Sequence, residues 1–150
     1  MGFFDKIKSA FNFDDDYEAR IKEAEKAHQF KMIPFSSDIH PYIREADAIV
    51  HPSYHEGMSN VLMEASATAR PVIASNISGC REIVDDGRSG ILFEPRSLDA
   101  LTAALDKFMN MDEGARREMG KAARSLVEQK FDRRSIILTY INEIKQIIKE

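Results

Sequence analysis

The chain has 150 residues, of which 43% are hydrophobic and 31% charged, the composition of one ordinary globular domain. Its net charge of -4 at pH 7 gives no electrostatic reason to expect nucleic acid as a partner. The single cysteine excludes an internal disulfide, and no apolar run approaches the roughly 20 residues of a membrane span. These features favour a cytoplasmic protein with a core of its own.

The first third of the chain predicts helices and one weak strand. Residues 1–12 carry an apolar stripe at helical spacing, and we expect this helix to dock on the protein's own core, with a membrane surface as the alternative. The stripe consists of Phe3, Phe4, Ile7 and Phe11. A helix is predicted at about 15–29, a short strand at 31–35 that Pro34 disfavours, and a helix at 38–46 with Asp38 as N-cap.

Strands and helices alternate from residue 47 onward. The expected strands are the short apolar runs 47–53, 70–75 and 90–95. The expected helices are 59–69, capped by Ser59, then 80–86, 97–109, 113–131 and 132–150. This alternation predicts an α/β fold, a Rossmann-like parallel sheet flanked by helices. Ligands of such sheets bind at the carboxyl ends of the strands, and residues 51–59 form one of those ends.

The stretch HEGMSNVLME, residues 55–64, places two glutamates around a predicted helix start. Backbone N–H groups of about 57–61 would point out of this helix end, where an anion such as phosphate is favoured. Glu64 would lie roughly 7 Å along the helix, at 1.5 Å per residue. Carboxylates accept hydrogen bonds from paired hydroxyls, so the frame fits a nucleotide sugar. Its phosphates would lie at the helix start, its sugar hydroxyls at Glu56 and its ribose hydroxyls at Glu64.

Three strings in order, HPSYHEGMSNVLMEA, RPVIAS and GCREIVDDGRSGILF, resemble the nucleotide-sugar-binding half of retaining GT-B glycosyltransferases. The branch is family 4-like and contains bacterial enzymes of capsule, exopolysaccharide and lipopolysaccharide assembly. The resemblance covers about residues 14–150, the donor-binding domain, and leaves 1–13 outside it. It implies that Glu56 is the catalytic-site residue that forms hydrogen bonds with the donor sugar, and that Glu64 binds the ribose. The donor-binding set that it implies is Gly57, Met58, Ser59, Asn60, Val61 and Glu64.

The implied reaction moves a sugar, with retention, from a nucleotide diphosphate sugar such as a UDP-sugar to a glycan or lipid-linked acceptor. The donor is a substrate, and neither a cofactor nor a metal is implied. Family members are about twice as long, with an N-terminal half that carries the acceptor site. We therefore expect a C-terminal domain that lacks its first strands and their phosphate-neutralising cations, and that is inactive alone. The alternative is a non-catalytic remnant or interaction module that needs a separately encoded N-terminal half or associates with itself. Peripheral attachment at the inner face of the membrane stays open.

Other residues have less specific readings. His51 and His55 could suggest a metal pair, but no helix is expected there and no third ligand is evident, so we expect no metal. His51 is expected near the pocket as a strand-end residue, and Cys80 as a small filler. Residues 81 and 82, arginine and glutamate, either pair on the surface or border the pocket. Ala69 stands where the family usually has glycine and would be strained at positive φ.

Overall fold

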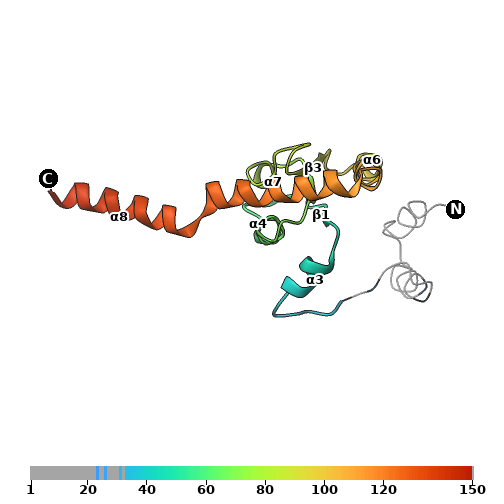
Figure 1. Cartoon of the computed structure of the whole chain (residues 1–150), viewed down its shortest axis with the longest axis horizontal. Coiled ribbons are helices and arrows are strands. Elements are labelled where there is room, and N and C mark those ends of the chain that lie inside the picture. Colours follow the sequence, from blue (N-terminus) through green and yellow to red (C-terminus); the bar gives the residue numbers. More distant parts are fainter. Residues whose placement is uncertain (1–22, 24–25, 27–30, 32, 150) are drawn as a thin grey trace. The chain divides into compact units, whose positions relative to one another are not determined.

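The computed structural model describes residues 23, 26, 31 and 33–149 (Figure 1). The chain divides into two units, residues 1–39 and 40–150, and each is described by itself. In the first unit, the helix expected at 1–12 lies outside the described residues. Of the helix expected at 15–29, Glu23 and Lys26 are described, and both are helical. The described residues of 31–35 form no strand, in line with the missing backbone N–H of Pro34.

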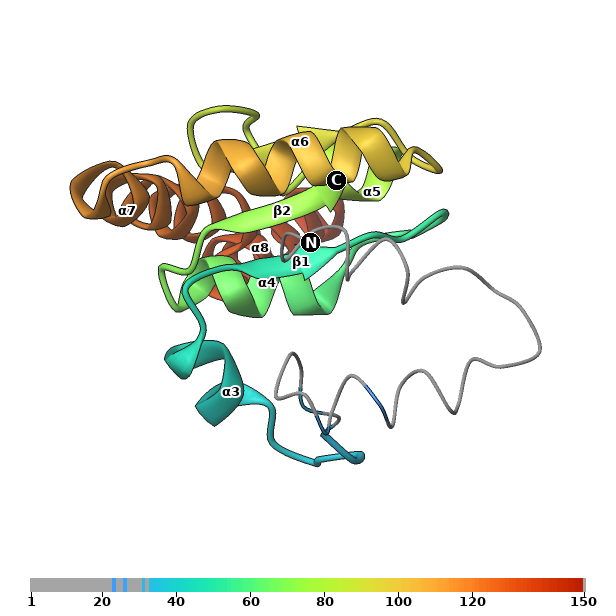
Figure 2. The ribbon, with the colours of Figure 1, turned by 90° about the vertical axis from the view of Figure 1, so that its right-hand side faces the viewer.

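The second unit contains a parallel sheet of three strands. Its elements in chain order are α3 His40–Glu45, β1 Ile49–His51, α4 Asn60–Ala67, β2 Val72–Ser75, α5 Ser78–Arg81, β3 Gly90–Phe93, α6 Leu98–Met109, α7 Glu113–Phe131 and α8 Arg133–Lys149. The strand order is β1-β2-β3, and both neighbouring pairs are parallel. In Figure 2 the arrowheads of β1 and β2 point the same way, toward the edge where α5 lies. The predicted parallel α/β sheet is therefore confirmed.

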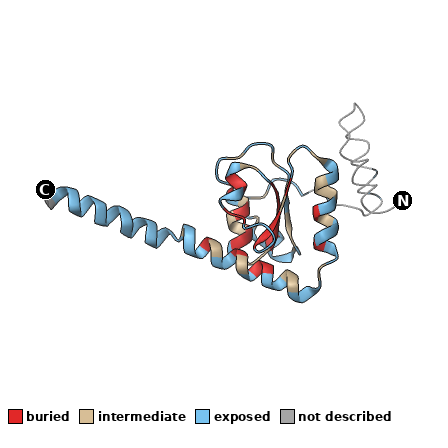
Figure 3. Ribbon diagram, turned by 90° about the horizontal axis from the view of Figure 1, so that it is seen from above, coloured by how far each residue is buried: buried red, intermediate tan, exposed pale blue. Residues whose placement is uncertain are grey.

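Helices cover both faces of the sheet, with α6 on one face and α4 on the other (Figure 2). The core on the α6 side joins side chains of β2, β3, α6 and α7, namely Ile73, Ile91, Phe93, Ala104, Phe108 and Met119. All four residues of β2 are buried, as its continuous apolar run predicts, and the buried residues gather in the middle of the domain in Figure 3. The outer strand β1 is less covered, because Val50 keeps 42% of its surface exposed. The covered part of the sheet is thus centred on β2 and β3.

Helix starts agree with the sequence at α4, α6 and α7, whereas α3 begins at His40, two residues after the expected cap Asp38. Ser59 accepts a hydrogen bond from the N–H of Leu62 at the start of α4, as predicted. Ser97 and Asp112 cap α6 and α7 in the same way, and the bounds of α7 match the prediction. The helix expected at 80–86 is misplaced, because α5 begins at Ser78 and contains Gly79. The sequence predicts a helix that begins after Gly79, because glycine usually interrupts helices, whereas in the structure Gly79 serves a close contact inside α5.

A second close contact involves the end of α4. Ala69, just after this helix, has a φ of 56°, which is the left-handed conformation. The sequence indicates this conformation because Ala69 stands where the family usually has glycine. A Cβ added to Gly120 of α7 would lie only 2.1 Å from the carbonyl oxygen of Ala69. Glycine at 120 therefore lets α7 cross the end of α4 in direct backbone contact.

The last helix, α8, has an exposed surface along its whole described length, coloured pale blue in Figure 3. Its exposed large apolar residues are Ile136, Ile137, Leu138, Tyr140, Ile141, Ile144, Ile147 and Ile148. Within the part of the chain that the structure describes, no helix is both long and apolar enough to cross a membrane.

Candidate functional site

The stretch that carries the predicted site lies at the carboxyl edge of the sheet. Residues 52–59 connect the end of β1 with α4, and α5 follows the end of β2 at the same edge. A Cβ added to Gly79, in α5, would lie 1.7 Å from the carbonyl oxygen of Gly57 and 2.7 Å from that of Glu56. Only glycine permits this approach of α5 to the loop. The contact fixes the backbone of the Glu56–Gly57 pair against the domain.

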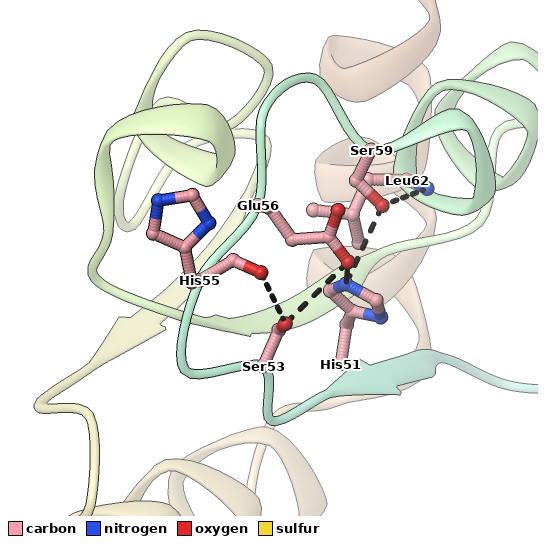
Figure 4. Close-up of polar contacts among 6 residues, drawn as sticks. All are labelled: His51, Ser53, His55, Glu56, Ser59 and Leu62. Atoms are coloured by element: carbon pink, nitrogen blue, oxygen red, sulfur yellow. Dashed lines mark hydrogen bonds and ion pairs between the residues drawn. The ribbon is translucent and has the colours of Figure 1, made fainter.

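The carboxylate of Glu56 is held by side chains that come from the end of β1 (Figure 4). Nε2 of His51 lies 2.9 Å from Oε1 of Glu56, and the Ser53 hydroxyl donates to the same oxygen over a longer 3.4 Å. Ser59 Oγ lies 3.4 Å from the same His51 nitrogen. The side chains of His51 and Glu56 are 21% and 30% exposed, so the pair is accessible to a ligand.

The first amides after this carboxylate are available to a ligand. The N–H groups of Gly57, Asn60 and Val61 donate to no acceptor among the residues that the structure describes. Asn60 and Glu64, four residues apart, share the outward side of α4, opposite the buried Leu62. Glu64 is half-buried, and its carboxylate has no hydrogen-bond or ion-pair partner within the described part of the chain. N–H groups of the loop and of the first turn of α4, and then the carboxylate of Glu64 on the same helix, therefore follow Glu56 in the chain.

Cys80 lies next to this loop and is fully buried. Burial raises the pKa of its thiol, and the charge of Glu56 raises it further. A neutral buried thiol is a poor nucleophile, so the residue acts as the small filler that the sequence predicts.

Two arginines lie near the same edge. Nη1 of Arg81 donates to the backbone oxygen of Asn76 at 3.0 Å and to its Oδ1 at 3.2 Å, just after β2. The sequence leaves two alternatives for Arg81 and Glu82, and an ion pair between them is absent from the described part of the chain. The guanidinium of Arg96 lies 5.5 Å from the ring centre of Tyr54, a cation–π contact between the loops after β3 and β1.

The structure brings Glu56 together with residues to which sequence reasoning gave no role. The sequence predicts His51 near the pocket only as a strand-end residue and assigns no role to Ser53. A histidine five positions before a glutamate, across a turn that follows a strand, was the available signal. Among the described residues, no group of three or more His, Cys, Asp or Glu side chains is placed to hold a metal ion.

A family model, described as glycosyl transferases group 1, matches residues 12–126. The chain belongs to this family. Its fold is that of the C-terminal domain of GT-B glycosyltransferases, which confirms the predicted fold class. The predicted roles of the residues from Glu56 to Glu64 stay predictions.

This member of the glycosyl transferases group 1 family is similar to the capsular polysaccharide biosynthesis glycosyltransferase CapM of Staphylococcus aureus. The two are 33% identical over 100 residues, which make up 67% of this chain and 26% of CapM. The chain thus spans about a quarter of the length of this relative.

Two solved structures resemble the fold. The C-terminal domain of the group 1 family protein LpcC of Francisella tularensis is 26% identical, with a TM-score of 0.65 that covers 79% of this chain and 64% of that one. HepE of Anabaena, solved in complex with UDP, is 22% identical, with a TM-score of 0.73 that covers 89% of this chain and 36% of that one. At this identity the likeness to HepE concerns the fold alone.

Proposed function

We propose that the chain is the donor-binding part of a glycosyltransferase that uses a nucleotide diphosphate sugar, a UDP-sugar, and retains the anomeric configuration. The acceptor is a glycan or a lipid-linked acceptor. The observation that carries the proposal is the stretch from Glu56 to Glu64, where two carboxylates lie near the start of α4 together with N–H groups that have no acceptor in the described part of the chain. Helix starts bind phosphate, and carboxylates bind hydroxyl pairs. HepE, which shares this fold, was solved in complex with UDP, the nucleotide of the proposed donor.

Each group of the site has one task in this proposal. Glu56 accepts hydrogen bonds from the hydroxyls of the donor sugar, and Glu64 accepts them from the ribose. The amides of 57–61 bind sugar and phosphate oxygens. As the bond between sugar and phosphate breaks, negative charge grows on the leaving diphosphate, and the dipole of α4 and these amides stabilise that charge. The donor is the substrate, and the proposal includes no cofactor.

Titration of the purified chain with UDP tests the proposal. Since only part of the anion site is expected, the dissociation constant for UDP should be high micromolar to millimolar, which corresponds to a binding free energy of about -4 to -5 kcal/mol. Glu64→Ala should weaken binding by about 1 to 3 kcal/mol, the scale for a lost hydrogen bond to a charged group. The control Glu128→Ala removes an equal charge from the exposed ion pair with Arg124 on α7 and should leave binding unchanged. Flat isotherms together with unmoved amide resonances of 57–61 at 5 mM UDP, roughly the weak end of that range, would rule the proposal out.

The same proposal predicts that the isolated chain does not transfer sugar. Holding donor and acceptor together supplies about 7 to 11 kcal/mol of a barrier, and the family's acceptor site belongs to the N-terminal half. Incubation of the chain with a UDP-sugar and a glycan acceptor should yield no product above background. Robust turnover that Glu56→Gln abolishes would contradict this part of the proposal.

The exposed surface of α8 favours a second candidate function, an interaction module that assembles with a separately encoded N-terminal half. Its eight exposed large apolar side chains would each contribute about 1.5 to 3 kcal/mol if fully buried. Sedimentation of the chain with the product of a neighbouring reading frame should then show a complex that Ile144→Lys disrupts. If the variant and the wild-type chain sediment alike with that product, α8 is not the contact.

A further inference from the structure

The orientation of the Glu56 side chain depends on one oxygen atom. Oε1 is 2.9 Å from His51 Nε2, whereas the Ser53 hydroxyl is 3.4 Å away, near the upper limit for such a bond. The other oxygen, Oε2, has no hydrogen-bond partner among the residues that the structure describes. Figure 4 shows Oε1 facing the imidazole while Oε2 carries no contact. One oxygen is thus anchored and the other is available.

The chemistry of the contact decides which nitrogen of His51 carries the proton. An ionised carboxylate can only accept hydrogen bonds, so the nitrogen that faces it must be protonated. Nε2 therefore carries hydrogen and donates it to Oε1. Ser59 Oγ, 3.4 Å from the same nitrogen, cannot donate to a protonated nitrogen and is a second, weaker acceptor. The contact thus has a defined direction, from ring to carboxylate.

His51 and Glu56 stand on elements of different rigidity. His51 is the last residue of β1, and its register partner in β2 is Ala74, so the sheet fixes its backbone. Glu56 lies in a loop whose backbone is fixed by the contact of Gly79 with Gly57. That contact fixes the backbone but not the direction of the side chain, which several rotamers could satisfy. The His51 ring supplies the missing constraint.

We propose that His51 is a positioning residue of the donor site, whose Nε2–H holds Oε1 of Glu56 so that Oε2 faces the sugar of the donor. The inference rests on the proposed contact of Glu56 with the donor sugar. It adds that a strand residue, without touching the donor, sets the geometry of that contact. Groups held by rigid elements are placed more accurately than groups held by loops alone.

A purely structural role of the pair predicts something different. If His51 and Glu56 only closed the loop, loss of their bond would disturb the loop amides and weaken UDP and UDP-sugars alike. A positioning role acts on the sugar alone. The measured quantity is therefore the ratio of the dissociation constant for UDP to that for each UDP-sugar.

Two variants separate these roles, because they differ only in reach. His51→Gln places an amide N–H group at about the position of Nε2, whereas the shorter His51→Asn places it near Nδ1 and cannot reach Oε1. Calorimetry would use UDP, UDP-glucose, UDP-galactose and UDP-N-acetylglucosamine. We expect His51→Asn to lower the ratio about tenfold for the preferred sugar, the lower scale for a bond to a charged group, while UDP binding stays within about twofold. His51→Gln should restore most of the ratio.

A measurement without ligand tests the same contact. Long-range nitrogen–proton NMR spectra of the wild-type chain should show His51 with its proton on Nε2, and Glu56→Gln should shift that signal. A His51 protonated on Nδ1 alone would overturn the inference. So would a His51→Asn variant with an unchanged ratio, or one that loses UDP and UDP-sugars in equal proportion while it stays folded.

The outcomes also distinguish this inference from the proposed function. If the wild-type chain binds UDP but no sugar more tightly than UDP, the positioning role is wrong and nucleotide binding stands. If the wild-type chain binds none of these compounds, both are wrong. Should His51→Asn unfold, the ratio measured with His51→Gln and the wild-type NMR signal still decide.

Discussion

Substitution of Gly79 by alanine should disrupt the support of the candidate site. The added Cβ would lie 1.7 Å from the carbonyl oxygen of Gly57, whereas real Cβ atoms essentially never come closer than 3.0 Å to another heavy atom. The difference between these distances means that α5 and the loop must separate by about 1.3 Å. The clash is with backbone, which cannot rotate away as a side chain can. We expect a loss of about 2 to 4 kcal/mol, at or above the usual range for overpacking. At about 2 to 4 °C per kcal/mol for a chain of this size, the melting temperature should fall by roughly 4 to 16 °C.

The control for this prediction lies on the other side of the same contact. A Cβ added to Gly57 meets no atom within 4 Å, so Gly57→Ala should change stability by less than about 1 kcal/mol, with a small gain expected from the stiffer unfolded chain. Thermal unfolding followed by circular dichroism compares both variants with the wild-type chain. Amide spectra of folded Gly79→Ala should also show shifted resonances for Glu56 and Gly57. If Gly79→Ala melts with the wild-type chain and leaves these resonances in place, the close contact between α5 and the loop does not exist.

Three further predictions concern the same part of the domain. Ala69→Gly should raise the free energy of unfolding by up to about 1 kcal/mol, because the φ of 56° strains alanine but not glycine; denaturant unfolding measures this, and a loss of stability would contradict it. Ser66→Ala should be neutral or stabilising in the same assay, because the buried Ser66 hydroxyl has no hydrogen-bond partner in the described part of the chain. Ser59→Ala, by contrast, removes the cap of α4 and should lower the free energy of unfolding by about 1 kcal/mol. Folding raises the pKa of the Cys80 thiol above its ordinary value of 9.0, so the unfolded chain loses this proton at a lower pH than the folded chain. The free energy of unfolding should therefore fall as pH rises past about 9. Unfolding curves recorded from pH 8 to 10 should show a smaller fall for Cys80→Ala.

Local signals in the sequence predicted most elements of the second unit. The capping side chain of Ser59 marked the start of α4, because a cap bonds the backbone only a few residues away. Apolar runs marked β2 and β3, because strands covered on both faces have no polar side. The left-handed conformation of Ala69 could be expected because the family usually has glycine at this position. Each of these features depends on neighbours in the chain.

The position of α5 could not be predicted in this way. Gly79 ends or interrupts helices in isolation, so the sequence placed the helix after it. In the structure the same residue lies inside the helix, because the carbonyl groups of the loop from Glu56 to Gly57 leave no room for a side chain. The partner of this contact is more than twenty residues away in the chain, and no periodic pattern records it.

The sequence by itself determined the α/β class, the parallel strands, and the stretch that carries Glu56 and Glu64, since apolar periodicity, capping residues and the order of family motifs are written along the chain. Only the tertiary structure decided how Glu56 is held. The direction of its carboxylate depends on a 2.9 Å contact with His51, and the backbone beneath it depends on contact with Gly79. Both are contacts through space, which exist only once the strand ends and α5 have been brought to one edge of the sheet.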